Sequence, residues 1–149
     1  MSESILEQRI QRLEDLEELR ALTARYAHAV NKGWDGKPLD TEAIPDLYAP
    51  DAHWASPDFG SIDGAAEIAA ALPEATAMVD ASMHAFMNPI ITVDGDTASG
   101  TWQLWVASVI RGELGSVYMP AELTYIRTSS GWRIQSVRLG EAKRGRFAG

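Results

Sequence analysis

The second half of the chain constrains the fold most, because it predicts four strands joined by short turns. The segments are His84–Val93, Thr97–Ile110, Gly115–Thr128 and Trp132–Leu139. Asp94-Gly95 lies between the first two strands and is a strong signal for a two-residue hairpin turn. Ser129-Ser130 separates the last two strands and predicts a second hairpin. A run of hairpins predicts an antiparallel sheet.

Helices precede these strands. Residues Ser4–Lys32 predict a long helix, because apolar residues recur at spacings of three and four. These residues are Leu6, Ile10, Leu13, Leu16, Leu19, Leu22, Tyr26 and Val30. Repeated spacings of three between Leu13 and Leu22 make the apolar stripe drift around the helix. A kinked helix and two abutting helices therefore both remain open.

The middle of the chain predicts shorter elements. Asn31–Pro38 contains two Gly, a Pro and an Asp, and predicts a loop. Thr41–Tyr48 predicts a short helix with Thr41 as its N-cap, and Ala52–Ser56 predicts a short strand. The remaining segments predict a turn over 60–64, a helix over 65–72 and a further helix over 74–81.

This order of elements predicts an α+β fold. The long N-terminal helix and the short helices pack against one face of a strongly curved, mostly antiparallel sheet. Such a sheet forms a cone whose apolar interior suits a ligand. At 149 residues the chain is expected to form one domain, 1–149. Its basic end, from about residue 141, contains Lys143, Arg144 and Arg146 and is expected to be a solvated tail.

Composition argues against several classes of function. The net charge of −8 argues against a nucleic-acid partner, because no basic stripe is present to neutralise phosphates. The absence of cysteine excludes disulfides, thiolate catalysis and zinc–sulfur sites. No apolar run approaches the roughly 20 residues of a membrane span, and the acidic N-terminus does not resemble a signal peptide. We therefore expect a cytoplasmic protein with no membrane partner.

Three polar side chains near the end of the long helix are expected to point in different directions. At about 100° per residue, Tyr26 lies within the buried face of the helix. His28 lies nearly opposite this face and is expected in solvent. Asn31 lies at the edge of the face, and two interpretations remain open. It is either a C-terminal cap, which Asn suits because it tolerates the left-handed conformation, or a residue that faces a pocket.

The first hairpin predicts which strand side chains share a face. With Asp94-Gly95 as the turn, one face is mostly apolar and holds Ala85, Met87, Ile91, Ala98, Trp102 and Leu104. This face needs a cover, either helices or another subunit, and we expect a homo-oligomer, a dimer or a trimer. The other face mixes aromatic and polar groups, which suits a pocket. It pairs His84 with Trp105, Phe86 with Gln103, and Asn88 with Thr101.

His84 is the best candidate for a catalytic base on this mixed face. His53 is a second candidate, although strand alternation leaves open whether His53 or Trp54 points inward. The three histidines His28, His53 and His84 show no metal-ligand spacing, so neither a metal nor another cofactor is expected. The candidate substrate-binding residues are Trp54, Phe86, Asn88, Gln103, Trp105 and Glu122.

Four stretches of the chain resemble the SnoaL-like group of the nuclear transport factor 2-like superfamily. They are RYAHAVNKGW, LYAPDAHWASP, SMHAFMNPIITVDGDTASGTWQLW and SSGWRIQSVRL. The group includes polyketide cyclases, scytalone dehydratase and bile-acid dehydratase, and the resemblance implies a cystatin-like cone. It does not single out a substrate, because the superfamily also hosts isomerases, epoxide hydrolases, dioxygenase β-subunits and non-catalytic members.

The resemblance also implies roles for individual residues. In the dehydratases of this group, an Asp near the end of the first helix partners a His on the sheet, and a Tyr polarises a carbonyl. The Tyr role falls to Tyr26 and the His role to His84. The Asp position falls on Asn31, which can hold His84 by a hydrogen bond but cannot stabilise an imidazolium by charge. Glu122 and Asp51 are candidates for a compensating acid, although Asp51 also suits a turn before its strand.

Three functions follow as hypotheses. The first is a lyase or isomerase, dehydratase- or cyclase-like, that acts on a cyclic or polycyclic hydroxy-carbonyl compound by proton abstraction without a metal. The second is a binding module that holds a hydrophobic cyclic small molecule without converting it, which the neutral Asn31 favours. The third, ranked last, is a structural subunit that resembles dioxygenase β-chains.

Overall fold

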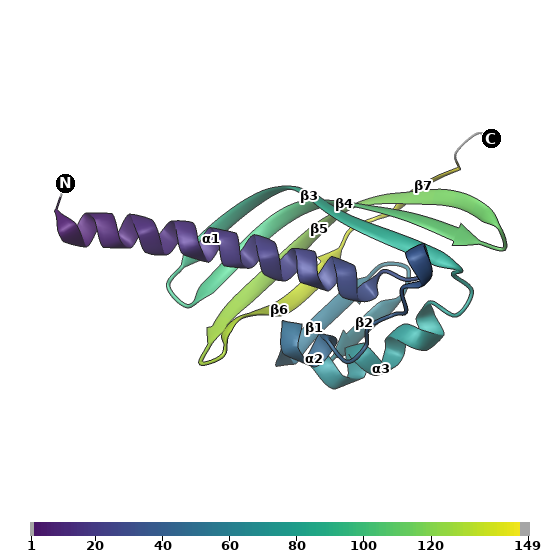
Figure 1. Cartoon of the computed structure of the whole chain (residues 1–149), viewed down its shortest axis with the longest axis horizontal. Helices are drawn as coiled ribbons and strands as arrows, with labels where there is room; N and C mark the ends of the chain where they lie inside the picture. Colours follow the sequence, from purple (N-terminus) through teal and green to yellow (C-terminus); the bar gives the residue numbers. More distant parts are fainter. Residues whose placement is uncertain (1, 147–149) are drawn as a thin grey trace.

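A long helix lies along a curved sheet, and two shorter helices lie beside the first two strands of that sheet (Figure 1). The computed structural model describes residues 2–146. Its helices are α1 (Glu3–Val30), the 3-10 helix η1 (Trp34–Gly36), α2 (Ile44–Leu47) and α3 (Ala65–Ala75). Its strands are β1 (Tyr48–Ser56), β2 (Gly60–Asp63), β3 (Ala81–Asp94), β4 (Thr97–Ile110), β5 (Glu113–Thr128), β6 (Gly131–Leu139) and β7 (Lys143–Arg146). None of the helices within this described range is long and apolar enough to cross a membrane.

The α1 helix is one continuous element of 28 residues, so the drifting apolar stripe produces neither a kink nor two helices. Its residues up to Glu14 are all exposed, and the helix projects past the sheet there (Figure 1). The later part packs on the sheet through the predicted face, with Leu19, Thr23, Tyr26 and Val30 buried. The stripe drifts because the two halves of the helix meet different surroundings: solvent first, and then the sheet.

A buried ion pair fixes the point where α1 meets the sheet. Both carboxylate oxygens of Asp15 accept hydrogen bonds from Arg127 on β5, at 2.8 and 3.0 Å. Trp132 Nε1 donates to the same carboxylate at 3.1 Å, and the Arg127 guanidinium lies 4.4 Å from the centre of the Trp132 ring. Asp15 is only 3% exposed, so its charge depends on these partners.

The strands form one mixed sheet in the order β2-β1-β6-β5-β4-β3. All neighbouring pairs are antiparallel except β1 and β6, which run parallel. The α+β architecture with a mostly antiparallel sheet is therefore confirmed. Lys143 and Arg144 of the expected solvated tail are exposed, but they belong to a strand: β7 pairs with β5, and Arg144 bonds Asp58 at 2.8 Å.

The register of the first hairpin differs from the prediction. The turn residues are Gly95 and Asp96, with Asp94 opposite Thr97, because glycine at positive φ suits the first central position of a type II′ turn. A bulge between Met87 and Ile90 then shifts the register again. Pro89 lies in this bulge, and a residue without an N–H is tolerated at a bulge on an edge strand such as β3.

This new register reverses the predicted grouping of side chains. His84 now lies opposite Val106, and Phe86 lies opposite Leu104. The apolar residues Ala98, Trp102 and Leu104 are buried beneath the helices, so the β4 part of the face expected to seek a second subunit belongs to the core, whereas Met87 on β3 is exposed. A shift by one residue moves every side chain of a strand to the opposite face.

Smaller differences occur in the middle of the chain. The helix predicted from Thr41 is shorter, and the Asp40 carboxylate, not Thr41, accepts a hydrogen bond from Ala43 N at 3.1 Å. The predicted turn over 60–64 is mostly the strand β2, paired with β1. The predicted second helix over 74–81 is absent, because α3 ends where the Thr76 hydroxyl donates to the Leu72 carbonyl at 2.8 Å.

Candidate active site between α1 and β3

The end of α1 is attached to the start of β3. Lys32 and Ser82 form an isolated antiparallel bridge, with backbone hydrogen bonds of 2.8 and 3.3 Å. The next residue, Gly33, has φ of 81°, and a Cβ there would lie 2.1 Å from the carbonyl oxygen of Asp80. Only glycine fits this close approach without strain. The attachment brings Asn31 beside His84, 53 residues further along the chain.

Asn31 holds His84 through one atom. Its Oδ1 accepts a hydrogen bond from the His84 backbone N–H at 2.7 Å and lies 2.9 Å from His84 Nδ1. The backbone N–H can only donate, so the Asn31 atom that faces it is the oxygen. The Nδ1 atom next to that oxygen must then carry a hydrogen. Neutral His84 is therefore the tautomer whose Nε2 has the free lone pair.

Asn31 occupies the C-cap position of α1 but does not adopt the left-handed conformation expected of an Asn cap. Its φ and ψ are −75° and 145°, which is extended backbone. Its backbone oxygen accepts a hydrogen bond from Lys37 Nζ at 2.8 Å. The side chain is thus turned towards β3, so its main partner is His84 and not the helix end.

Burial lowers the pKa of His84 to about 4, from an ordinary value of 6.5. A charged imidazolium would lose hydration here, and the neutral Asn31 amide cannot replace it by charge. His84 is therefore neutral near pH 7. It is available as a proton acceptor, but as a weak one.

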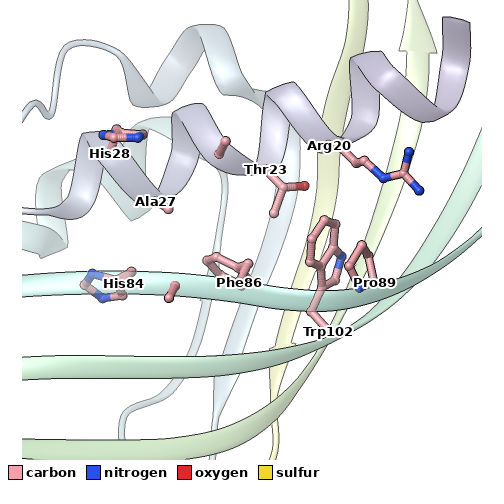
Figure 2. A pocket seen from close by; sticks show the side chains of 10 residues that line it. Arg20, Thr23, Ala27, His28, His84, Phe86, Pro89 and Trp102 are labelled. Carbon is pink, nitrogen blue, oxygen red and sulfur yellow. The ribbon is translucent and has the colours of Figure 1, made fainter.

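A cleft of about 400 Å³ lies between α1 and β3, and His84 lines it. Figure 2 shows the two walls: α1 contributes Arg20, Thr23, Ala27 and His28, and the strands contribute His84, Phe86, Pro89 and Trp102. The alanines Ala24 and Ala27 leave room between the helix and the strand. A volume of this size is in the range that accommodates small molecules.

Two of the polar groups in the cleft wall already have partners. The Thr23 hydroxyl donates to the Leu19 carbonyl at 2.8 Å and lies 2.7 Å from the Tyr125 hydroxyl. Trp102 Nε1 donates to the same Tyr125 hydroxyl at 3.1 Å. This buried network leaves the middle of the cleft apolar towards a ligand, with Phe86 and the two alanines as the contact surface.

Tyr26 does not line this cleft. It is 7% exposed and packs behind Phe86, with ring centres 5.8 Å apart, and edge-on to Tyr48 at 5.4 Å. Burial raises the pKa of Tyr26, and the polar groups of Tyr48 and Trp54 beside it oppose part of that increase. Trp54 is half-buried and packs against Phe59. Neither Tyr26 nor Trp54 is among the residues that line the cleft with His84.

Four further candidates lie on the outer face of the sheet, so the prediction that Asn88, Gln103 and Trp105 share a pocket face with His84 is wrong. Asn88 Nδ2 donates to Gln103 Oε1 at 2.7 Å, and both residues are exposed. Trp105 stacks on Tyr118 at 6.4 Å. Glu122 is exposed between the buried Ala121 and Leu123. The cause is the shifted hairpin register, which divides the predicted mixed face between the two sides of the sheet.

The other acid–base candidates also lie elsewhere. His53 Nδ1 is 2.6 Å from Asp63 Oδ1, at the β1–β2 edge of the sheet. Asp51 is exposed and accepts a hydrogen bond from Gln135 at 3.3 Å. Within residues 2–146, no group of three His, Asp or Glu side chains could hold a metal ion.

Sequence reasoning missed two residues of the cleft, His28 and Arg20. The expectation that His28 is in solvent is confirmed, because the residue is exposed, but it also lines the same cleft as His84. Both residues lie off the apolar stripe of α1, and such positions normally face solvent. The only local signal was the small size of Ala24 and Ala27 on the same side of the helix.

The chain is similar to proteins of a known family. The model of the SnoaL-like domain matches residues 11–138. Among solved structures, an NTF2-like protein with a cystatin-like fold from Novosphingobium aromaticivorans is 30% identical, with a TM-score of 0.80. That similarity covers 93% of this chain and 89% of the other. None of the curated proteins matches the chain.

More distant structures share the fold alone. A candidate scytalone dehydratase from N. aromaticivorans is 15% identical, with a TM-score of 0.75 over 93% of this chain and 91% of that one. A hexachlorocyclohexane dehydrochlorinase from Novosphingobium barchaimii is also 15% identical, with a TM-score of 0.78 over 94% of both chains. The fold thus occurs in proteins named for elimination reactions. By its family match and its 30% identical relative, the chain belongs to the SnoaL-like domain family of NTF2-like proteins with a cystatin-like fold.

Proposed function

We propose that this protein is a lyase or isomerase that acts on a hydrophobic, cyclic hydroxy-carbonyl compound bound between α1 and β3. His84 Nε2 is the base. The observation that carries the proposal is the pair of hydrogen bonds to Asn31 Oδ1, at 2.7 and 2.9 Å, which fixes the tautomer and orientation of His84. A base held by its other nitrogen in a largely apolar cleft suits proton abstraction next to a carbonyl.

The proposed reaction begins when His84 Nε2 takes a proton from the carbon next to the carbonyl. The electron pair of that C–H bond forms an enolate. In a dehydration, the enolate re-forms the carbonyl as the β-carbon–oxygen bond breaks. The proton on Nε2 passes to the departing hydroxyl, so water leaves and neutral His84 is regenerated. In an isomerisation, the same proton returns to a different carbon.

The partner of the enolate differs from the one that the family resemblance implies. Tyr26 packs behind Phe86 and does not line the cleft, so we assign it the role of supporting that ring. His28 lies across the cleft from His84, on α1. An imidazole N–H there can donate a hydrogen bond to the developing enolate oxygen.

Hydrogen exchange tests the abstraction step without knowledge of the natural substrate. The protein is incubated with 1-tetralone in D2O, and loss of the α-proton signal is followed by NMR. We expect exchange above the buffer rate in the wild type and none above it in His84→Gln. His53→Gln is the matched control, because His53 bonds Asp63 away from the cleft. Equal exchange in wild type and His84→Gln would refute the assignment of the base.

A specific observation favours a second candidate, a non-catalytic binding module. His84 has a pKa of about 4 and a neutral partner, so it is a weak base near pH 7. In that case His84 Nε2 would only accept a hydrogen bond from the ligand. Binding of 1-tetralone in the cleft with no exchange above the buffer rate would support this function over catalysis.

A further inference from the structure

The cleft has a distinct polar end that the proposed reaction does not use. Arg20 lines the cleft from α1 at the end away from the two histidines, near Pro89 and Trp102 (Figure 2). Eight residues separate Arg20 from His28 on the same helix, which corresponds to about 12 Å along its axis. The walls between them are apolar or already hydrogen-bonded, as described for Thr23 and Trp102.

The Arg20 guanidinium has no hydrogen-bond or ion-pair partner among the described residues 2–146. Arg20 is exposed, so water can hydrate its guanidinium. Two arginines elsewhere have carboxylate partners: Arg127 pairs with Asp15 and Asp96, and Arg144 pairs with Asp58. What distinguishes Arg20 is its place, because it is the arginine among the residues that line the cleft. Arg20 thus presents five N–H donors at one end of an apolar cleft, and no carboxylate of the described residues occupies them.

We propose that Arg20 selects substrates that carry a carboxylate, so that the ligand of this cleft is an anionic ring compound. The carboxylate binds Arg20, two fused rings lie against Phe86 and Ala27, and the far end of the molecule reaches His84. Arginine matches a carboxylate with two parallel hydrogen bonds, which fixes orientation as well as charge. This assignment deepens the proposed function, because it names the class of compound that the His84 base would meet.

Charge at one end and a base at the other also determine the direction of binding. A neutral ring compound could enter the cleft in either orientation. A carboxylate on Arg20 leaves only one orientation, in which the ring carbon farthest from the carboxylate lies next to His84. Orienting the reacting carbon in this way is a recognised source of rate enhancement.

Two probes of equal shape test the proposal: 2-naphthoate, which is anionic, and 2-naphthamide, which is neutral. Binding is measured by isothermal titration calorimetry for the wild type, Arg20→Gln and Arg20→Lys. We expect the wild type to bind naphthoate about tenfold more tightly than naphthamide, and Arg20→Gln to lose most of this preference. Arg20→Lys retains the charge but not the paired geometry, so it should keep part of the preference.

Arg12→Gln is the matched control, because Arg12 is an exposed arginine on the projecting part of α1 and lines no part of the cleft. It should behave as the wild type. Unchanged naphthamide binding in Arg20→Gln shows that the cleft is intact. Raised salt should weaken naphthoate binding and leave naphthamide binding unchanged.

The outcomes separate this inference from the proposed function. Equal affinity for the two probes in the wild type, or no naphthoate binding at millimolar concentration, overturns the role of Arg20. An unchanged naphthoate preference in Arg20→Gln overturns it as well. Selective naphthoate binding, together with 1-tetralone that binds but does not exchange, supports the role of Arg20 and refutes only the catalytic proposal.

Discussion

One oxygen atom of Asn31 accepts hydrogen bonds from both the backbone amide and Nδ1 of His84, at 2.7 and 2.9 Å. The contact joins the end of α1 to β3 and fixes which His84 nitrogen carries the hydrogen. It also gives this partly buried histidine an uncharged partner, so that desolvation keeps the pKa of His84 at about 4. Position 31 therefore determines both the orientation and the basicity of the candidate base.

The low pKa of His84 makes folding stability depend on pH. The folded protein keeps His84 neutral, whereas the unfolded chain protonates it below its ordinary pKa of 6.5. The contribution of neutral His84 to the stability of the folded protein is complete above pH 6.5 and is lost as the pH falls from 6.5 towards 4. The free energy of unfolding, measured with urea, should fall between pH 7 and pH 4.5 in both proteins. The fall should be about 1–2 kcal/mol smaller in His84→Gln than in the wild type. Equal losses in the two proteins would contradict the burial of a neutral His84.

The Asp15–Arg127 pair should be the strongest polar contribution to α1 docking. Asp15→Ala leaves Arg127 half-buried without its main partner and removes the acceptor of Trp132 Nε1. Loss of one partner of a buried ion pair lowers the free energy of unfolding by about 3–5 kcal/mol. Because Arg127 is partly exposed, we expect a loss near the lower end of this range. Asp58→Ala removes an exposed pair with Arg144 and should cost less than about 1 kcal/mol.

Lowering the pH should weaken the ion pair between Asp15 and Arg127. Hydrogen bonds from Arg127 hold the pKa of Asp15 below its ordinary value of 3.8. The stabilisation is thus present above pH 3.8 and is lost as pH falls through the lower pKa of the folded state. Urea unfolding should show the wild type and Asp15→Ala converging in stability at acidic pH. A constant difference at every pH would mean that the charge of Asp15 is not the cause.

Self-association remains a prediction, but its predicted surface changes. The outer sheet face exposes Met83, Met87, Leu114 and Tyr118, with Trp105 stacked beside Tyr118. Exposed apolar side chains grouped on one face are typical of an interface between subunits. We expect a dimer or trimer in sedimentation equilibrium at micromolar concentration, and a shift to monomer in the double variant Met83→Glu, Met87→Glu. A wild-type protein that is monomeric under these conditions would refute the prediction.

The helical half of the fold was predictable because its signal is local. The spacing of Leu19, Tyr26 and Val30 identified the buried face of α1 directly. The pairing of Asn31 with His84 came from the resemblance to the family, because no local pattern links residues so far apart. The structure places the two in contact.

The strand faces were not predictable from alternation alone. Gly95 at the first turn position and the bulge at Pro89 together changed the register. The turn lies one residue later than predicted, and the bulge shifts the pairing by a single residue. Since a single step reverses a strand, Gln103 and Trp105 moved to the outer face and Trp102 moved to the core. Arg20 and His28 were missed because the cleft is formed jointly by the flank of α1 and the edge strand β3, which are far apart in sequence.

The most direct test of the central claim is an NMR titration of the His84 imidazole in the wild type and in Asn31→Asp. The substitution keeps the shape and the accepting oxygen but adds a negative charge. Since an adjacent carboxylate stabilises imidazolium, the pKa of His84 should rise from about 4 towards or above 6.5. Exchange of 1-tetralone should rise at least about tenfold with it. An unchanged His84 pKa, or a raised pKa with no gain in exchange, would contradict the account in which Asn31 sets the strength of a catalytic base.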